Sequence, residues 1–282
     1  MKRGRIAAAP ISWGVCEVPG WGHQLDPRRV LDEMAGLGVT ASEFGPDGFL
    51  PGPLLAERGI TAVGGFVPVV LHEEAYDPLP RVRAALGRFA AAGAGTLVLA
   101  AATGADGYDE RPELPPEAWR TLLRRLDEVA GAAAAEGVTA ALHPHVGTLV
   151  EGPDEVARVL DGSGVGLCLD TGHVLVGGGD PVALARKAAD RVAHVHLKDV
   201  DTARAEKVAA GSATYSAAVA AGLYRPLGSG GLDLDGLVEA LEAAGYQGWY
   251  VMEQDTVLDR EPPPGGGPVA DVAASLRWLD AV

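Results

Sequence analysis

The sequence predicts a single α/β domain built as a (β/α)8 TIM barrel over residues 1–282. Eight short apolar runs alternate along the chain with eight stretches that have helical periodicity. The runs are apolar throughout, as in Thr96-Leu-Val-Leu-Ala-Ala101, which is typical of strands in a parallel sheet covered on both faces. A doubly wound sheet is the alternative, and no Gly-x-Gly-x-x-Gly follows the first strand to support it.

The elements are expected in strict alternation. The strands are predicted at residues 5–12, 41–45, 61–71, 96–103, 138–145, 165–170, 192–197 and 249–253. The helices are predicted at residues 26–37, 52–58, 79–92, 116–136, 153–160, 181–190, 234–244 and 268–279. Asp26 and Asp180 precede prolines at the first helical turn and can act as N-caps. Glycines follow the helices where a left-handed C-cap is wanted, at Gly38, Gly59, Gly93, Gly137 and Gly245.

Residues 199–231 interrupt this alternation between the seventh strand and the last crossover helix. The alanine-rich centre of the insertion, at 203–221, predicts a short helix. Loops after barrel strands lie over the active-site face, so the insertion is expected to form a substrate lid or a subunit contact. Tyr215 and Tyr224 are expected to be exposed there, at a contact in a homo-oligomer.

The composition excludes several classes of partner. A formal charge of −15 and a pI near 4.8 argue against binding to nucleic acid or to an anionic membrane. No apolar run approaches the roughly 18 residues that a membrane span requires, and the basic start at residues 1–5 is not followed by a signal-peptide core. Cys16 and Cys168 are expected to be free, buried thiols, which indicates a cytoplasmic protein.

Five of the seven histidines lie between residues 143 and 196, close to the ends of predicted strands. The carboxyl ends of barrel strands surround one opening, so side chains there can converge on a divalent metal ion. Asp170, His196, Glu253 and one of the pair His143 and His145 can supply four ligands. Mixed nitrogen and oxygen ligands suit Mn²⁺, Co²⁺, Fe²⁺ or Zn²⁺ better than Ca²⁺.

The neighbouring polar residues leave alternatives open. His145, His173 and His194 can be partners of the ligands or substrate contacts as readily as ligands themselves. Glu43 ends the second strand and can face either the substrate or a structural salt bridge. Trp13 follows the first strand and can form a wall of the pocket or pack in the core.

The chain resembles the xylose isomerase-like barrel enzymes, known as sugar phosphate isomerases and epimerases, and within them the inosose (2-keto-myo-inositol) dehydratase branch. The resemblance spans nearly the whole chain. It rests on the motifs Ala9-Pro-Ile-Ser-Trp13, Ser42-Glu-Phe-Gly45, His143-Pro-His-Val-Gly-Thr148, Leu169-Asp-Thr-Gly-His173, His194-Val-His-Leu-Lys-Asp199 and Gly248-Trp-Tyr-Val-Met-Glu253.

The resemblance implies a residue-by-residue assignment. Asp170, His196 and Glu253 match the family's metal ligands on strands six, seven and eight, and His143 stands where the epimerases have a second glutamate. This departure disfavours two-carboxylate epimerisation. Lys198 belongs to the shared His-Val-His-Leu-Lys-Asp motif and is expected, with His194, Glu43 and Trp13, to contact the substrate. The sequence Gly64-Gly65-Phe66 lacks the lysine expected in typical inosose dehydratases.

The expected reaction is metal-assisted enolisation of a keto-polyol with one divalent ion, Mn²⁺ or Co²⁺ ahead of Zn²⁺, Fe²⁺ or Mg²⁺. Glu253 or a nearby histidine would remove the proton next to the ketone, and a protonated His173 or His145 would assist the loss of water. The same enediolate also leads to isomerisation or epimerisation of a sugar. A non-catalytic sugar-binding barrel is a third interpretation, and the negative charge disfavours a DNA-repair endonuclease of a related barrel family.

Overall fold

The computed structural model describes residues 3–281 and forms a barrel of parallel strands. The strand order is β3-β2-β1-β11-β8-β7-β6-β5-β4. Its two ends, β3 (Thr61–Ala62) and β4 (Gly64–Val70), are consecutive segments of one extended stretch interrupted at Val63. The Val63 N–H donates to the carbonyl of Ser42, and the Val63 carbonyl accepts from the Thr96 N–H at 3.2 Å. The hydrogen bonding is therefore continuous around the barrel, and the predicted fold class is confirmed.

Each predicted strand is found, in most cases shorter than expected. Besides β3 and β4, the barrel strands are β1 (Ile6–Ala8), β2 (Ala41–Ser42), β5 (Thr96–Ala102), β6 (Thr139–Leu142), β7 (Gly166–Asp170), β8 (Val192–Leu197) and β11 (Tyr250–Met252). The prediction that the first strand reaches residue 12 was wrong. The chain turns at Pro10 into a 3-10 helix, η2 (Pro10–Trp13), because proline has no N–H to continue a ladder.

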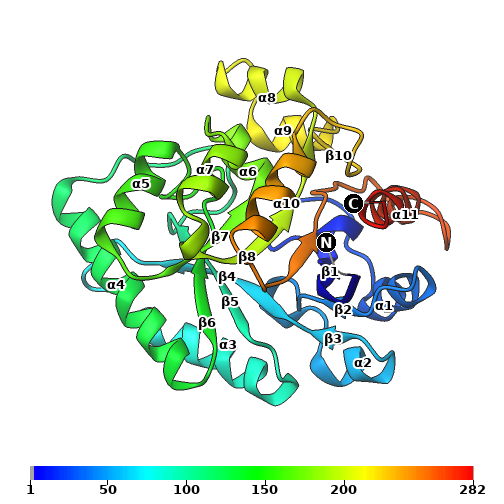
Figure 1. Ribbon diagram of the computed structural model, residues 1–282, viewed down its shortest axis with the longest axis horizontal. Helices are drawn as coiled ribbons and strands as arrows, with labels where there is room; N and C mark the ends of the chain where they lie inside the picture. The colour runs from blue at the N-terminus through cyan, green and yellow to red at the C-terminus, as the bar shows by residue number, and fades with distance from the viewer. Residues whose placement is uncertain (1–2, 282) are drawn as a thin grey trace.

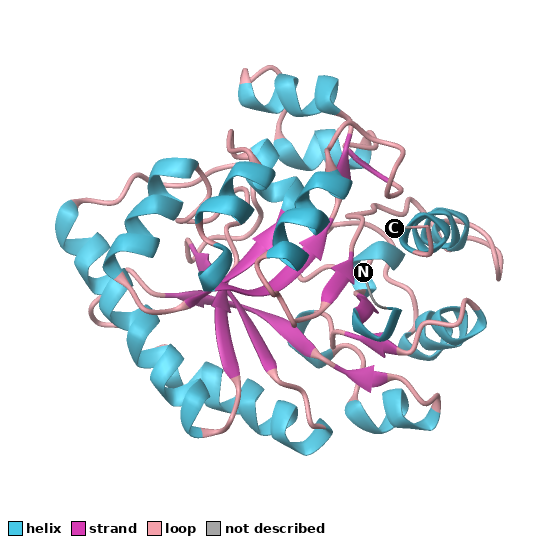
Figure 2. Ribbon diagram, viewed as in Figure 1, coloured by secondary structure: helices cyan, strands magenta, loops and turns pink. Residues whose placement is uncertain are grey.

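The helices surround the strands on the outside of the barrel (Figures 1 and 2). The eight predicted helices are present as α1 (Pro27–Gly36), α2 (Gly52–Glu57), α3 (Leu79–Ala92), α4 (Pro116–Ala135), α5 (Pro153–Gly162), α7 (Pro181–Lys187), α10 (Leu234–Ala243) and α11 (Pro268–Leu279). Short 3-10 turns occur at η1 (Arg3–Arg5), η3 (Pro46–Gly48) and η4 (Ala189–Arg191). No helix within residues 3–281 is long and apolar enough to cross a membrane.

One helix outside the insertion was not predicted. The segment α6 (Thr171–Val176) starts directly after β7, and the Asp170 side chain caps it by accepting the His173 N–H at 2.8 Å. Asp170 therefore uses one carboxylate oxygen, Oδ1, for the fold, and its Oδ2 stays available on the other side.

The insertion at residues 199–231 forms a small layer above the carboxyl end of the barrel. It contains β9 (Asp199–Val200), α8 (Thr202–Ala209), α9 (Tyr215–Ala220) and β10 (Tyr224–Arg225), shown in yellow tones at the top of Figure 1. The prediction of a single short helix at 203–221 was wrong, because the turn at residues 210–214 divides this segment into two helices. β10 pairs antiparallel with β9. Tyr215 and Tyr224 are buried in an apolar cluster that includes Trp21 and Val146 of the barrel loops. The expectation that these tyrosines are exposed at a subunit contact was wrong, because the insertion folds onto its own barrel.

Candidate active site

A cavity opens at the carboxyl end of the strands. The residues expected at the site that line this cavity are Glu43, His143, His145, His196, Lys198 and Glu253. Asp170, His173 and His194 are fully buried in contact with those residues and do not line the cavity themselves. Nine of the ten expected site residues therefore belong to one connected group; the exception is Trp13.

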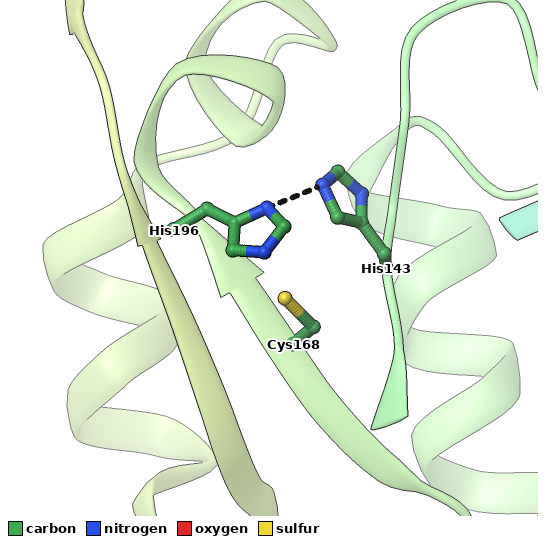
Figure 3. A group of neighbouring side chains, drawn as sticks. All are labelled: His143, Cys168 and His196. Carbon is green, nitrogen blue, oxygen red and sulfur yellow. Dashed lines mark hydrogen bonds between the residues drawn. The ribbon is translucent and has the colours of Figure 1, made fainter. Parts of the chain in front are cut away.

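Four side-chain atoms from four strand ends converge at one point. His143 Nε2 lies 3.1 Å from His196 Nδ1 (Figure 3) and 3.4 Å from Asp170 Oδ2. His196 Nδ1 lies 3.6 Å from Asp170 Oδ2 and 3.2 Å from Glu253 Oε2. Atoms that bind one ion at about 2.0–2.2 Å lie roughly 3–3.5 Å from one another. Asp170 Oδ2 is buried, and the Lys198 ammonium lies 3.0 Å from it. Asp170, His196 and Glu253 therefore form a group that could hold one divalent ion, and His143 lies beside His196 and Asp170 as a fourth candidate ligand.

The hydrogen bonds on the far side of both rings orient them for ligation. Glu43 Oε1 lies 3.0 Å from His196 Nε2 and 2.7 Å from His194 Nε2. His143 Nδ1 lies 2.9 Å from the carbonyl of Pro144. His143 Nε2 and His196 Nδ1 share a hydrogen bond, and although burial opposes the charge, Cys168, Glu253 and Glu43 raise the pKa of His196 well above its usual value. A divalent ion would replace the shared proton, and the hydrogen bonds to Glu43 and to the Pro144 carbonyl would keep both nitrogens turned toward it. Metal-binding histidines are held in this way in general.

Glu43 is ionised in this arrangement. Burial opposes its ionisation, but the charges and hydrogen bonds of His196 and His194 outweigh burial and lower the pKa of the Glu43 carboxyl. Glu43 Oε1 contacts the rings of both His194 and His196. Glu43 therefore contacts the side of the His196 ring that faces away from the metal position, and it also lines the cavity. This geometry gives Glu43 a positioning role beside the substrate contact expected from sequence.

Replacing Glu43 by glutamine tests that positioning role. Glu43→Gln keeps an oxygen for the ring N–H but removes the charge that makes His196 a stronger ligand. We expect Mn²⁺ affinity to fall about 10–100-fold, the usual cost of losing such a partner. Isothermal titration calorimetry on metal-stripped protein measures this. The matched control is Glu33→Gln, which alters a carboxylate that accepts the Trp13 ring N–H outside the cavity. Equal affinities of the two variants would contradict the role.

Cys168 offers a competing ligand set with His143 and His196 (Figure 3). Residues two apart on a strand share a face, so Cys168 lies one layer below Asp170 in the barrel interior, and it does not line the cavity. Burial raises the pKa of the Cys168 thiol to about 11, which favours the neutral, weakly ligating form. The carboxylate set is therefore the better match. Both cysteines are free as predicted, although Cys16 is only partly buried.

His145 and His173 stack beside the ligands, with ring centroids 3.7 Å apart. Both rings are buried, and burial lowers the pKa of each well below that of a free histidine. The expectation of a protonated histidine acid at these positions conflicts with this environment, because a buried imidazolium beside a second ring is destabilised. A neutral imidazole has one N–H donor and one nitrogen acceptor, so each ring can still form hydrogen bonds with a substrate or with neighbouring residues.

Lys198 places a positive charge inside the acidic cluster. Its Nζ lies 3.0 Å from Asp170 Oδ2, 2.9 Å from Glu253 Oε2 and 3.0 Å from Asp255 Oδ1. Burial disfavours the ammonium, but the three carboxylates outweigh it and raise the pKa of Lys198. Lys198 is therefore charged. It contacts the candidate metal ligands Asp170 and Glu253, and it also lines the cavity, as a substrate contact must.

The Gly172 position of the Asp-Thr-Gly-His motif lets Lys198 pack. A Cβ at residue 172 would lie 2.6 Å from Tyr224 Cε1 and 2.8 Å from Lys198 Cβ. We expect Gly172→Ala to lower the free energy of unfolding by about 1–3 kcal/mol, measured by urea denaturation. Gly131→Ala in α4 is the control, because no atom lies within 4 Å of its added Cβ, and it should be neutral or stabilising. A Gly172→Ala protein as stable as this control would contradict the close packing.

Several residues line the cavity that were not expected there from the sequence: Cys16, Glu17, Phe66, Tyr108, Tyr215 and Asp255. The Tyr108 hydroxyl donates to Glu17 Oε1, and its ring packs at a tilt against His145 with centroids 4.3 Å apart. Burial raises the pKa of Glu17, which favours a protonated carboxyl. Of these residues, only Asp255 could have been predicted from the sequence, because it lies two residues after Glu253. In the structure it accepts a hydrogen bond from the Tyr215 hydroxyl at 2.9 Å.

Trp13 does not reach the cavity. Its side chain is fully buried in the hydrophobic core, and its ring N–H donates to Glu33 Oε2 at 3.0 Å. The turn that begins at Pro10 directs Trp13 toward α1 and away from the strand ends. Of the two alternatives for Trp13, core packing is the one that the structure supports, and the pocket-wall expectation was wrong.

Comparisons with known proteins place this geometry in a family. Residues 55–282 match the family described as "Xylose isomerase-like TIM barrel". The chain is 34% identical over 268 residues to the Rhizopine catabolism protein MocC of Rhizobium meliloti, covering 89% of this chain and 81% of that protein. It is 31% identical over 268 residues to the inosose dehydratase of Geobacillus kaustophilus, covering 89% and 87%. The crystal structure of the IolI protein with a bound zinc atom superposes with a TM-score of 0.69 over 98% of this chain and 96% of that chain, at 15% identity.

Proposed function

Because the chain belongs to the xylose isomerase-like TIM-barrel family, we propose that it is a metal-dependent enzyme that removes water from inosose or a closely related keto-polyol. Relatives named inosose dehydratase align with nearly the whole chain. The observation that carries the proposal is the convergence of His143, Asp170, His196 and Glu253 at one wall of a cavity. The zinc atom bound by IolI supports a divalent ion in this fold.

A divalent ion held by these four residues would polarise the ketone and stabilise the negative charge that develops on enolisation. The side chains of the chain supply the rest. Glu253 lines the cavity, and although burial opposes its ionisation, His196 and Lys198 lower the pKa of its carboxyl. Glu253 is thus a carboxylate in contact with the substrate space. We assign it the removal of the proton next to the ketone.

Loss of a hydroxyl group needs a proton donor. Glu17 is a better donor than His145 or His173, because burial raises the pKa of Glu17 and lowers the pKa of both histidines. Glu17 lies on the loop before α1, and the hydroxyl of Tyr108 holds its carboxyl group in the cavity wall. His145 then remains a hydrogen-bonding contact for the polyol, packed against Tyr108.

An isomerase or epimerase is the second candidate, and one observation favours it. Glu17 and Glu253 both line the cavity, so two carboxyl groups from different loops face the same space. Two such groups can move a proton between neighbouring carbons or between faces of one carbon. The strand-five position occupied by His143 weighs against the usual two-glutamate arrangement.

The test is an activity assay on purified protein stripped of metal and then supplied with Mn²⁺ or Co²⁺. With scyllo-inosose, the proposal expects a metal-dependent rise in ultraviolet absorbance from the conjugated enol. Metal-dependent interconversion of ketohexoses without dehydration of inosose would assign the isomerase candidate instead. A protein that binds metal and turns over neither substrate class would overturn both proposals and favour a sugar-binding barrel.

Three sequence-based expectations remain predictions. These are Mn²⁺ or Co²⁺ as the physiological ion, a cytoplasmic location and assembly into a homo-oligomer. The burial of Tyr215 and Tyr224 removes only the contact residues first expected for that assembly.

A further inference from the structure

The Thr171 hydroxyl holds the backbone of Lys198 on both sides of its side chain. Its N–H donates to Thr171 Oγ1 at 2.8 Å, and the Thr171 hydroxyl donates to the Lys198 carbonyl at 2.6 Å. The side chain is 2% exposed and passes over Gly172 toward the strand ends. Its ammonium lies 5.4 Å from the centre of the Tyr224 ring. The position of the charge is therefore built into the fold.

The ammonium contacts the two oxygen atoms that a metal ion would use. Asp170 Oδ2 and Glu253 Oε2 face His196 Nδ1, and the same two atoms lie 3.0 Å and 2.9 Å from Lys198 Nζ. The other oxygen of Asp170, Oδ1, is committed to the N-terminus of α6. A divalent ion and the ammonium would thus share both oxygens at a separation of only a few ångströms, where like charges repel strongly.

A third carboxylate lies on the other side of the ammonium. Asp255 Oδ1 is 3.0 Å from Lys198 Nζ, while Asp255 Oδ2 accepts from the Tyr215 hydroxyl. Asp255 does not belong to the group of four atoms that surround the metal position. Asp255 can therefore keep the Lys198 ammonium paired when Asp170 and Glu253 bind a divalent ion.

We propose that Lys198 is a resident competitor of the metal ion, which neutralises Asp170 and Glu253 in the metal-free protein and shifts to Asp255 when a divalent ion binds. The competitor holds the carboxylates together before metal arrives, and it weakens the affinity of the site. The inference rests on the metal centre of the proposed function and not on the identity of the substrate.

The experiment measures Mn²⁺ affinity by isothermal titration calorimetry on the full-length, metal-stripped protein and its Lys198→Met variant. Methionine keeps most of the stem and removes the charge. Lys198→Met is expected to bind Mn²⁺ about tenfold more tightly or better, because one repelling unit charge is lost from the site. The control is Lys207→Met, an exposed lysine of α8, which should leave the affinity within about twofold of wild type because solvent screens its charge. Equal or weaker Mn²⁺ binding by Lys198→Met overturns the proposal.

A double-mutant cycle tests the shift to Asp255. Asp255→Asn removes the alternative partner, so Mn²⁺ affinity should fall severalfold in the wild-type background. In the Lys198→Met background the same change should cost clearly less, because no ammonium needs a new partner. Identical losses in both backgrounds would overturn the shift.

The Lys198→Met substitution removes the cation that pairs with three buried carboxylates. If the metal-free variant is too unstable for calorimetry, a thermal measurement takes its place. The rise in Tm on adding Mn²⁺ then replaces the titration, and it should be larger for Lys198→Met than for wild type. A smaller or equal rise overturns the proposal. The wild-type data separate the two levels of inference. Wild-type protein that binds no Mn²⁺ refutes the metal centre and Lys198's role together, whereas Mn²⁺ binding without inosose turnover refutes only the proposed reaction.

Discussion

Glu253→Gln is expected to lower kcat for inosose dehydration by about 10²–10⁴-fold, the usual contribution of a general base. Glutamine keeps the size and one oxygen of Glu253 but cannot accept the proton. Since Glu253 Oε2 also faces His196 Nδ1, the substitution removes one negative charge from the metal position as well. Steady-state kinetics at saturating Mn²⁺ separate the two effects, because added metal compensates for a lost ligand but not for a lost base.

The control for this variant is Glu206→Gln, which changes an exposed carboxylate on α8 and should leave kcat unchanged. Circular dichroism of both proteins checks that the fold is retained. A Glu253→Gln enzyme within about tenfold of wild-type kcat at saturating Mn²⁺ would contradict the assignment of the base, and the proton-removing role would then pass to another cavity residue.

Asp170→Asn is expected to weaken Mn²⁺ binding by about 100-fold or more, because it removes a full negative charge from a buried ligand position. Asp170 has no exposed surface, and its Oδ2 lies 3.4 Å from His143 Nε2 and 3.0 Å from Lys198 Nζ. Asparagine is as good an N-cap as aspartate, so the hydrogen bond to the start of α6 can be kept. The loss should therefore appear in metal affinity more than in the ability to fold.

Asp180→Asn is the matched control for Asp170→Asn. Asp180 caps α7 by accepting the N–H groups of Val182 and Ala183, and it lies outside the cavity. Calorimetric titration of Mn²⁺ should give the wild-type affinity for Asp180→Asn. Equal affinities for the two asparagine variants would show that Asp170 serves only as a helix cap.

The sequence predicted the architecture because the relevant signals are local. Each buried strand is a continuous apolar run, and each helix has its own periodicity and terminal residues, so alternation could be read without knowing which segments touch. How the barrel closes could not be predicted from the sequence, because it depends on the backbone at Val63. Val63 interrupts one strand so that its two halves pair with different neighbours.

The predicted residues came together because strand ends meet in a barrel, and this holds for His143, Asp170, His196 and Glu253. Individual roles depended on tertiary contacts that no local pattern contains. Which nitrogen of His196 faces the cavity is decided by Glu43, which lies 153 positions away along the chain.

Residues on loops were the hardest to predict. Glu17 and Tyr108 come from different loops and meet only because both loops cover the same opening, so neither shows periodicity or a motif. The insertion was expected as a lid or subunit contact from its position alone. Its tyrosines instead complete the polar network around Asp255, which depends on how α9 and β10 pack on the barrel.

One divalent ion is expected to bind between His143, Asp170, His196 and Glu253. Crystals grown with Mn²⁺ and measured for anomalous scattering test it most directly. We expect one strong peak about 2.0–2.4 Å from His143 Nε2, His196 Nδ1, Asp170 Oδ2 and Glu253 Oε2, with Lys198 Nζ displaced toward Asp255. A peak among Glu43, His194 and His196, or no peak in the cavity at all, would contradict it.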